Sequence, residues 1–302
     1  MEKYWEVFIS GYEAYAYYLR TEIAIPHWHN YFYWLIGVSL FFFLLEMFAP
    51  WRKEQKKFRH DFWLDLFYMF FNYFLFSLFI FNAASMVVVN LFNDALASIG
   101  ITNLVAIQIG NLPAWAQLII LFVIRDFIHW NVHRLLHRVP ALWEFHKVHH
   151  SVEEMGFAAH LRFHWMENVV YNGLQYIPLA MIGFGIEEYF IVYLVTLVIG
   201  HANHSNIWIP LGPLKYVINS PQMHIWHHAR HWPDGHPYGI NYGISLSLWD
   251  YLFRTASIPH NGRDIELGFE DIEKFPKTFL GQSVHGMGLR KKREKRDPQS
   301  KQ

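Results

Sequence analysis

The longest apolar runs of the chain are nearly free of charge, and this restricts the folds open to it. Residues 31–49 contain Glu46 as their only charged residue, and residues 62–92 contain only Asp65. About 20 consecutive apolar residues match the hydrocarbon thickness of a bilayer, so each run is long enough for a membrane-spanning helix. Charged residues make up 17% of the sequence, whereas a soluble domain carries about 25%. We therefore expect an integral, multi-pass membrane protein.

A basic segment between these two runs sets their expected orientation. Residues 51–60 contain five Lys or Arg residues and one Glu. The positive-inside rule places such a loop in the cytoplasm and the N-terminus outside. Residues 61–124 contain no Lys or Arg, which agrees with an external or membrane-embedded connector at 93–113. Four charged residues before position 20 argue against a cleavable signal peptide.

Two further apolar stretches complete the expected membrane region. Residues 115–124 lead directly into Arg125, and residues 168–200 carry only Glu187 and Glu188 as charges. We expect the first stretch to return the chain to the cytoplasmic side and the second to form a helical hairpin that crosses or partly enters the bilayer. The predicted fold is an all-α integral membrane protein with about four transmembrane helices and a cytoplasmic helical cap. Buried core helices of a soluble protein are the alternative.

The sequence predicts three consecutive parts. Residues 1–112 would anchor the chain in the membrane, residues 113–257 form a histidine-rich region that includes the hairpin at 168–200, and residues 258–302 form a cytoplasmic tail with a basic run at 290–296. The absence of cysteine excludes disulfides, thiolate-bound zinc, iron–sulfur clusters and a cysteine nucleophile. We expect the membrane as a partner and no nucleic acid.

Histidine is the residue type that composition does not explain. The chain has 20 histidines, and fifteen of them lie between positions 129 and 236. On a helix, residues i, i+3 and i+4 fall within an arc of about 100°, so each copy of the pattern HxxHH should aim three imidazoles at one point. The spaced sets are His129, His133 and His137; His146, His149 and His150; His160 and His164; His201 and His204; and His224, His227 and His228.

These clustered imidazoles predict a metal centre. Imidazole suits zinc, copper, iron and nickel, and eight or more imidazoles exceed what one ion accepts, so the count indicates two metals. A zinc protease site would need Glu after the first histidine of HRLLH, where this chain has Arg134. A haem protein needs only one or two axial histidines. A membrane protein that binds or transports metal ions remains an alternative.

The histidine patterns and the segments that follow them carry a family resemblance. The sequence reads HRLLH at 133–137, HKVHH at 146–150 and HIWHH at 224–228, followed by NYG at 241–243 and WDYLFRT at 249–255. From about residue 126 to residue 255, the chain resembles the fatty acid hydroxylase/sterol desaturase superfamily of membrane non-haem iron oxygenases. The region 113–257 would then be the catalytic one.

The resemblance implies a dimetal centre, usually two iron ions. Its ligands would be His133, His137, His146, His149, His150, His164, His204, His224, His227 and His228. His129, His160 and His201 are additional histidines that leave the ninth and tenth ligands open.

Three polar residues near the histidines are expected to support the site. Asp126 lies seven residues before His133, on the same helical face, where it could accept a hydrogen bond from an imidazole or pair with Arg125. Asn241 and Asp250 could bond ligating histidines or turn the chain.

The resemblance also implies a reaction. O2 and external electrons would be used to hydroxylate or desaturate a C–H bond of a lipid, which would enter from the bilayer. A cytochrome b5-type protein, or a ferredoxin with its reductase, is the expected donor, because the sequence carries no nucleotide-binding GxGxxG pattern. The three patterns HRLLH, HKVHH and HIWHH do not distinguish among fatty acyl, sterol, sphingolipid and related substrates.

Overall fold

The structure is a computed structural model, and it describes residues 1–288. The described chain is mostly helical, in agreement with the predicted class. Its helices are α1 (Glu2–Ala24), α2 (Tyr31–Phe48), α3 (Phe62–Phe70), α4 (Asn82–Ser98), α5 (Ala114–Arg138), α6 (Pro140–His150), α7 (Trp165–Ala180), α8 (Ile186–His204), α9 (Pro221–His227), α10 (Leu248–Leu252) and α11 (Phe279–Ser283). Two π-helical turns, η1 (Phe71–Leu75) and η2 (Ser77–Phe81), join α3 to α4, and the 3-10 turns are η3 (Phe157–Leu161), η4 (Gly212–Tyr216) and η5 (Ile272–Lys274). The strands β1 (Ile107–Gln108) and β2 (Ile182–Gly183) form one short parallel pair.

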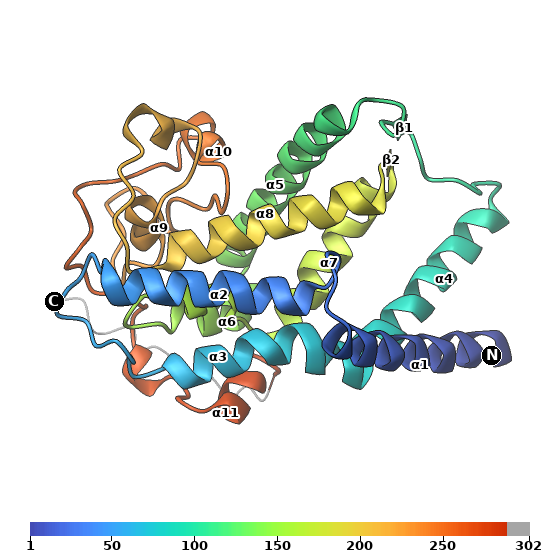
Figure 1. The fold of residues 1–302 in the computed structure, drawn as a ribbon, viewed down its shortest axis with the longest axis horizontal. Helices are drawn as coiled ribbons and strands as arrows, with labels where there is room; N and C mark the ends of the chain where they lie inside the picture. The colour runs from blue at the N-terminus through green and yellow to red at the C-terminus, as the bar shows by residue number, and fades with distance from the viewer. Residues whose placement is uncertain (289–302) are drawn as a thin grey trace, which may run out of the picture.

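The helices form an elongated bundle with a different structure at each end. Helix α8 packs on α2, α5 and α9, and α5 also packs on α6 and α7. Helices α1 and α4 pack on each other at the end that carries the N-terminus, whereas α9, α10 and α11 lie towards the opposite end (Figure 1). The basic run at 290–296 lies outside the described residues.

Two helical stretches have the length and composition to cross a membrane within residues 1–288. They are Tyr31–Phe48 and Phe62–Phe79, which coincide with the first two predicted spans. The predicted hairpin is helical, since it consists of α7 and α8 joined by a short connection that holds β2. Whether α5 and the α7–α8 hairpin cross the bilayer stays a prediction.

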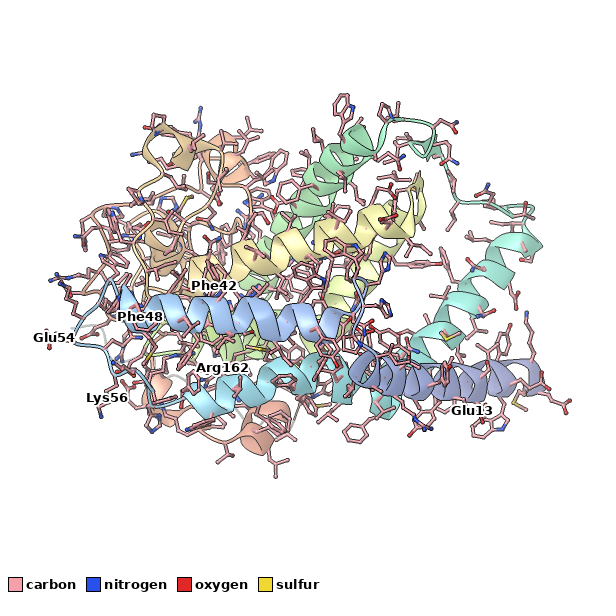
Figure 2. All side chains as sticks on the ribbon, in the orientation of Figure 1. Glu13, Phe42, Phe48, Glu54, Lys56 and Arg162 are labelled. Carbon is pink, nitrogen blue, oxygen red and sulfur yellow. The ribbon has the colours of Figure 1, made fainter. Side chains whose placement is uncertain are left out.

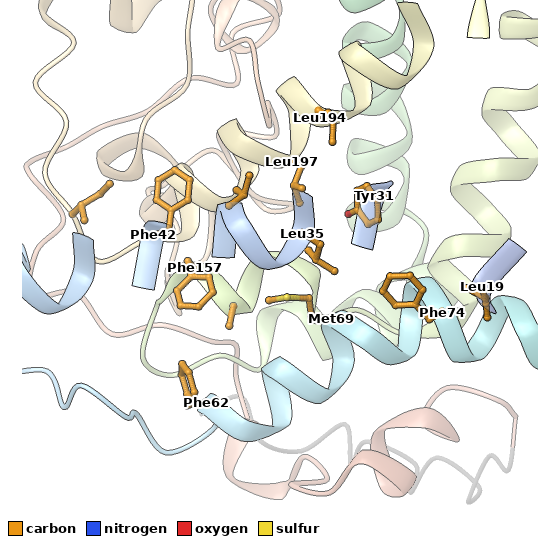
Figure 3. Packing of buried hydrophobic residues seen from close by; sticks show 13 residues of the cluster. Leu19, Tyr31, Leu35, Phe42, Phe62, Met69, Phe74, Phe157, Leu194 and Leu197 are labelled. Atoms are coloured by element: carbon orange, nitrogen blue, oxygen red, sulfur yellow. The ribbon is translucent and has the colours of Figure 1, made fainter. Parts of the chain in front are cut away.

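Helix α2 shows how an apolar helix is divided between core and surroundings. Leu35 is fully buried, and together with Phe42 and with Leu197 of α8 it belongs to one cluster of buried apolar residues (Figure 3). On the other face, Leu40 and Phe41 are 53% and 57% exposed. A soluble protein places polar residues on such a face. This exposed apolar face favours the membrane protein over the alternative of buried core helices.

A buried ion network fixes the loop before α7. The guanidinium of Arg162 (Figure 2) is almost fully buried and donates to Asp61 at 2.8 Å and to Asp65 at 3.1 Å, and Arg59 also pairs with Asp65. Asn72, in the π-helical turn η1, donates to two backbone carbonyls of the same loop. The start of α3 therefore positions the chain between α6 and α7, next to the histidines.

Candidate metal centre

Nine buried histidines form two adjacent groups. In each group, one ring nitrogen of every member lies within 4.8 Å of the corresponding nitrogens of the others. Group A consists of His133 and His137 from α5, His146 and His150 from α6, and His227 from α9; group B consists of His149 from α6, His204 from α8, and His224 and His228 from α9 and its C-cap. All nine were expected as ligands from the sequence.

The spacing predicted that each HxxHH segment would aim three imidazoles at one point, and this prediction is wrong. In HKVHH, His146 and His150 belong to group A and His149 belongs to group B. In HIWHH the division is reversed, because His224 and His228 belong to group B and His227 belongs to group A. On a helix, residue i+4 lies about 40° from residue i on one side and residue i+3 about 60° from it on the other. Each helix therefore lies between the two groups and contributes to both.

Hydrogen bonds at Nδ1 show which ring nitrogen is free to bind a metal. Nδ1 of His133 lies 2.7 Å from the carbonyl oxygen of Tyr242, and Nδ1 of His227 lies 2.8 Å from the carbonyl oxygen of Ile240. His149 and His204 make the same kind of contact, with Arg162 and Gly200. A carbonyl accepts only, so Nδ1 carries the proton in these rings and Nε2 presents a lone pair.

The Nε2 atoms converge at distances that a shared cation explains. The Nε2–Nε2 separation is 3.3 Å between His204 and His149 and 3.1 Å between His204 and His224. None of these imidazole pairs can form a hydrogen bond if both Nε2 atoms are unprotonated, and two facing lone pairs repel. Neighbouring ligands about 2.1 Å from one ion stand about 3.0–3.4 Å apart. In group A, the Nε2–Nε2 separation is 3.1 Å both between His133 and His146 and between His150 and His227. The residues present therefore fit a metal in each group.

Further features of the rings agree with metal binding. Burial, reinforced by the neighbouring imidazoles, lowers the pKa of His149, His224 and His228 well below its usual range, and it lowers that of His227 to about 3. The neutral imidazole is the form that binds a metal. Neither ring nitrogen of the buried His137 has a hydrogen-bond partner within residues 1–288, and a buried polar atom of this kind calls for a ligand.

Glu167 is a site residue that the sequence analysis missed. It lies in the first turn of α7, and one carboxylate oxygen accepts from Nδ1 of His146 at 2.7 Å while the other accepts from the backbone N–H of His164 at 3.1 Å. A carboxylate in this position fixes the tautomer of a ligating histidine and raises its basicity. The signal in the sequence was the spacing of His164 and Glu167, which form a capping box at the start of a helix.

Replacing Glu167 should weaken metal binding without removing a ligand. In Glu167→Gln, the side chain loses its charge and one of its two acceptor positions, so we expect metal affinity to fall about 10- to 100-fold. Competition for Fe(II) with a chelator of known affinity measures this change. Glu187→Gln, an exposed carboxylate on α8, is the matched control. An affinity equal to that of the parent protein would rule out this role.

Asp126, Asn241 and Asp250 do not bond the histidines directly. Asp126 accepts from the backbone of residues 245 and 246 and from Trp249, so neither the expected imidazole contact nor a pair with Arg125 is formed. Asn241 has φ of 55° and exchanges hydrogen bonds with the backbone of Ser257. The expected contacts with histidines are wrong, because the backbone carbonyls on either side of Asn241 accept from the histidines instead. The alternative expected for Asn241 and Asp250, that they turn the chain, agrees with their hydrogen bonds to the backbone.

Asp250 holds that carbonyl-bearing loop in place. The carboxylate accepts from the backbone N–H groups of Tyr242 and Gly243 at 3.0 and 2.7 Å, and from Trp130 and Thr255. Burial raises its pKa, and the four donors counteract this. Asp126 and Asp250 together fix the 240–250 loop, and through it the tautomers of His133 and His227.

The remaining candidate histidines lie outside both groups. The structure does not bring His164 to the centre: its Nε2 lies 2.9 Å from the carbonyl oxygen of Ser283, and its Nδ1 caps α7 by accepting from Met166. His129 stacks on Tyr171 at 4.4 Å between ring centroids. His160 and His201 contact each other through their Nδ1 atoms at 2.9 Å.

A cavity of about 220 Å³ leads to the histidines between α5, α7 and α8. Its inner wall includes members of both groups, namely His133, His146, His149 and His204. Tyr171, Tyr189, Tyr193 and Leu197 of these helices form the apolar part of the wall, and the other residues that they contribute to it are polar or charged. Such a space can hold a mainly apolar molecule beside the metal-binding nitrogens.

Comparisons with known proteins agree with this geometry. Residues 118–255 match the family model described as fatty acid hydroxylase, and this range contains every member of groups A and B. The chain is 31% identical over 182 residues to ornithine lipid hydroxylase OlsE of Rhizobium tropici, a match that covers 60% of this chain and 54% of that protein. No solved structure matches at a significant level.

Other relatives match a little less than half of the chain. Alkylglycerol monooxygenase of Caenorhabditis elegans is 30% identical over 148 residues, which is 47% of this chain and 27% of that enzyme. Very-long-chain aldehyde decarbonylase GL1-10 of Oryza sativa subsp. japonica is 25% identical over 143 residues, with 46% of each protein covered. The chain therefore spans about half, or less, of the relatives it matches.

Proposed function

We infer that the chain belongs to the fatty acid hydroxylase superfamily, and from this we propose that it is a membrane-bound, O2-dependent oxidoreductase that hydroxylates a lipid. The observation that carries the proposal is the pair of buried histidine groups at the inner end of a cavity between α5, α7 and α8. Hydroxylation is preferred to desaturation because the relatives include proteins named lipid hydroxylase and monooxygenase.

Groups A and B would each hold one iron ion. Bound iron would supply the activation of O2 and the removal of hydrogen from an unactivated C–H bond. The balanced reaction converts a C–H bond, O2, two electrons and two protons into C–OH and water. The protein would fix the imidazoles through the 240–250 loop and Glu167, exclude bulk water by burying all nine rings, and position the lipid against His133, His146, His149 and His204.

The histidine groups would face the cytoplasm. The backbone N–H of Trp51, at the start of the basic segment 51–60, donates to the carbonyl of Asn206 at 2.9 Å, two residues after His204 of group B. The basic segment, with Glu54 and Lys56 at its tip, lies at the end of the bundle opposite the N-terminus (Figure 2). Because this segment is predicted to be cytoplasmic, an external cytochrome b5-type donor or a ferredoxin with its reductase would reach the site from that side.

Isotope incorporation and metal analysis test this function. Membranes that contain the protein, supplied with reductant under 18O2, should yield lipids that gain one 18O atom, and the purified protein should hold about two iron ions per chain. Membranes with the double variant His137→Ala/His224→Ala are the control and should give unlabelled lipids. One exchangeable zinc ion per chain, or metal flux into liposomes without labelled lipid, would instead support a metal carrier.

A further inference from the structure

Arg125 is a buried cation in the wall of the cavity. It lies on α5 and is 9% exposed. Its Nη1 donates to the hydroxyl of Thr196 at 3.1 Å, while its Nε is buried without a partner within residues 1–288. No carboxylate in that described range lies within ion-pair distance of it, and the adjacent Asp126 is bound to the 240–250 loop.

Aromatic rings on α8 compensate this charge only in part. The guanidinium carbon lies 5.9 Å from the ring centroid of Tyr189 and 5.5 Å from that of Tyr193. These are long cation–π contacts, and they leave the Nε–H of the guanidinium without a hydrogen-bond acceptor. A charge held away from water is expensive unless it is paired with an opposite charge and hydrogen-bonded. The structure therefore presents a guanidinium that needs an anion.

Two amide side chains of α7 line the same cavity. Gln175 is 8% exposed, and neither its amide group nor that of Asn172 forms a hydrogen bond within residues 1–288. Each amide offers two N–H donors. Arg125 and these amides thus place N–H donors on the cavity wall. The carboxylates of Asp126 and Glu167 line the same cavity, but both already accept hydrogen bonds from other groups of the protein.

We propose that Arg125 binds the anionic group, a carboxylate or a phosphate, of the lipid on which the enzyme acts, and that this contact selects anionic lipids over neutral ones. The inference rests on the proposed function. A guanidinium matches both anions through paired N–H donors. Arg125 and His133 of group A are eight residues apart on one helix, or about 12 Å along its axis. The reacting carbon would therefore lie within the hydrocarbon chain, away from the anionic group.

Equilibrium binding of three matched probes tests the proposal. Palmitate, hexadecyl phosphate and hexadecanol carry the same chain length and differ in the terminal group. The purified, iron-loaded full chain in detergent, kept free of O2 so that no turnover occurs, should bind palmitate or hexadecyl phosphate at least tenfold more tightly than hexadecanol. The tighter of the two anions identifies the group that the site prefers. In Arg125→Gln the preference should be lost while hexadecanol binding stays unchanged, and Arg125→Lys should restore part of it.

Arg138→Gln is the matched control, because Arg138 is an exposed arginine on the same helix that does not line the cavity; it should keep the full preference. Hexadecanol binding to the parent as tightly as both anions, or a preference that survives Arg125→Gln, would overturn the proposal. The parent measurement needs no variant, so it decides even if Arg125→Gln does not fold. A clear anion preference in a protein that fails to oxidise lipid would reject the proposed function but support anion binding by Arg125.

Discussion

His137→Ala and His224→Ala should each abolish lipid hydroxylation, with product formation falling by more than about 10³-fold, as for residues that act as a unit in one centre. The two substitutions should differ in metal content. Group A retains four imidazoles without His137, whereas group B retains three without His224. We therefore expect His224→Ala to lose more iron. Iron analysis of the purified variants, together with product measurement in membranes, checks both expectations.

His164→Asn is the control for these variants. His164 was expected to be a ligand from the sequence, yet its ring nitrogens contact Ser283 and Met166. Asparagine keeps the helix cap, because its side-chain oxygen accepts from the start of a helix as well as any residue. The variant should retain about two iron ions per chain. Loss of an ion from His164→Asn, with unchanged iron in His137→Ala, would reject the assignment of the groups.

Asp250→Ala should destabilise the protein strongly although Asp250 contacts no histidine. The change leaves three buried donors, from Tyr242, Gly243 and Trp130, and the half-buried hydroxyl of Thr255 without an acceptor. At about 1–3 kcal/mol for each unsatisfied group, the free energy of unfolding should fall by about 4 kcal/mol or more. The apparent melting temperature in detergent should drop by roughly 10 °C. Iron affinity should fall as well, since the loop that orients His133 and His227 is released.

Asp250→Asn separates the hydrogen bonds from the charge. Three of the four donors reach Oδ1 and only the N–H of Gly243 reaches Oδ2, so an amide oxygen in the Oδ1 position keeps most of the contacts. We expect less than half the loss seen in Asp250→Ala. Asp264→Ala, which removes an exposed pair with Arg263, should change stability by less than about 0.5 kcal/mol. Equal losses in Asp250→Ala and Asp264→Ala would contradict the role of the loop.

The sequence predicted the features that depend on spacing along the chain. The charge-free runs indicated the two stretches that prove long and apolar enough to span a membrane. The three patterns HRLLH, HKVHH and HIWHH contained eight of the nine residues of groups A and B, and the ninth, His204, came from the separate pair His201 and His204. The division of each HxxHH segment was not predictable, because it depends on how α6 and α9 face each other across the centre. Periodicity describes one helix at a time, whereas this arrangement is set by tertiary packing.

Backbone groups account for most of what the sequence analysis missed around the site. The acceptors for His133, His149, His204 and His227 are carbonyl oxygens, and a carbonyl has no residue type by which to recognise it. Asp126 and Asp250 were singled out correctly as polar residues near the histidines, but the loop between them and the imidazoles is visible only in three dimensions. Arg125 stood out in the sequence as the end of an apolar run, not as the wall of a cavity.

The two groups share the helices that build them, and this links the occupancy of one to the occupancy of the other. An ion in group A joins His146 and His150 of α6 to His227 of α9, and it thereby holds His149 beside His224 and His228 in group B. The first ion has then already ordered the imidazoles that the second ion needs. The affinity of group B for the second ion therefore rises. Filling of the centre should be cooperative, and half-loaded molecules should be scarce at every metal concentration.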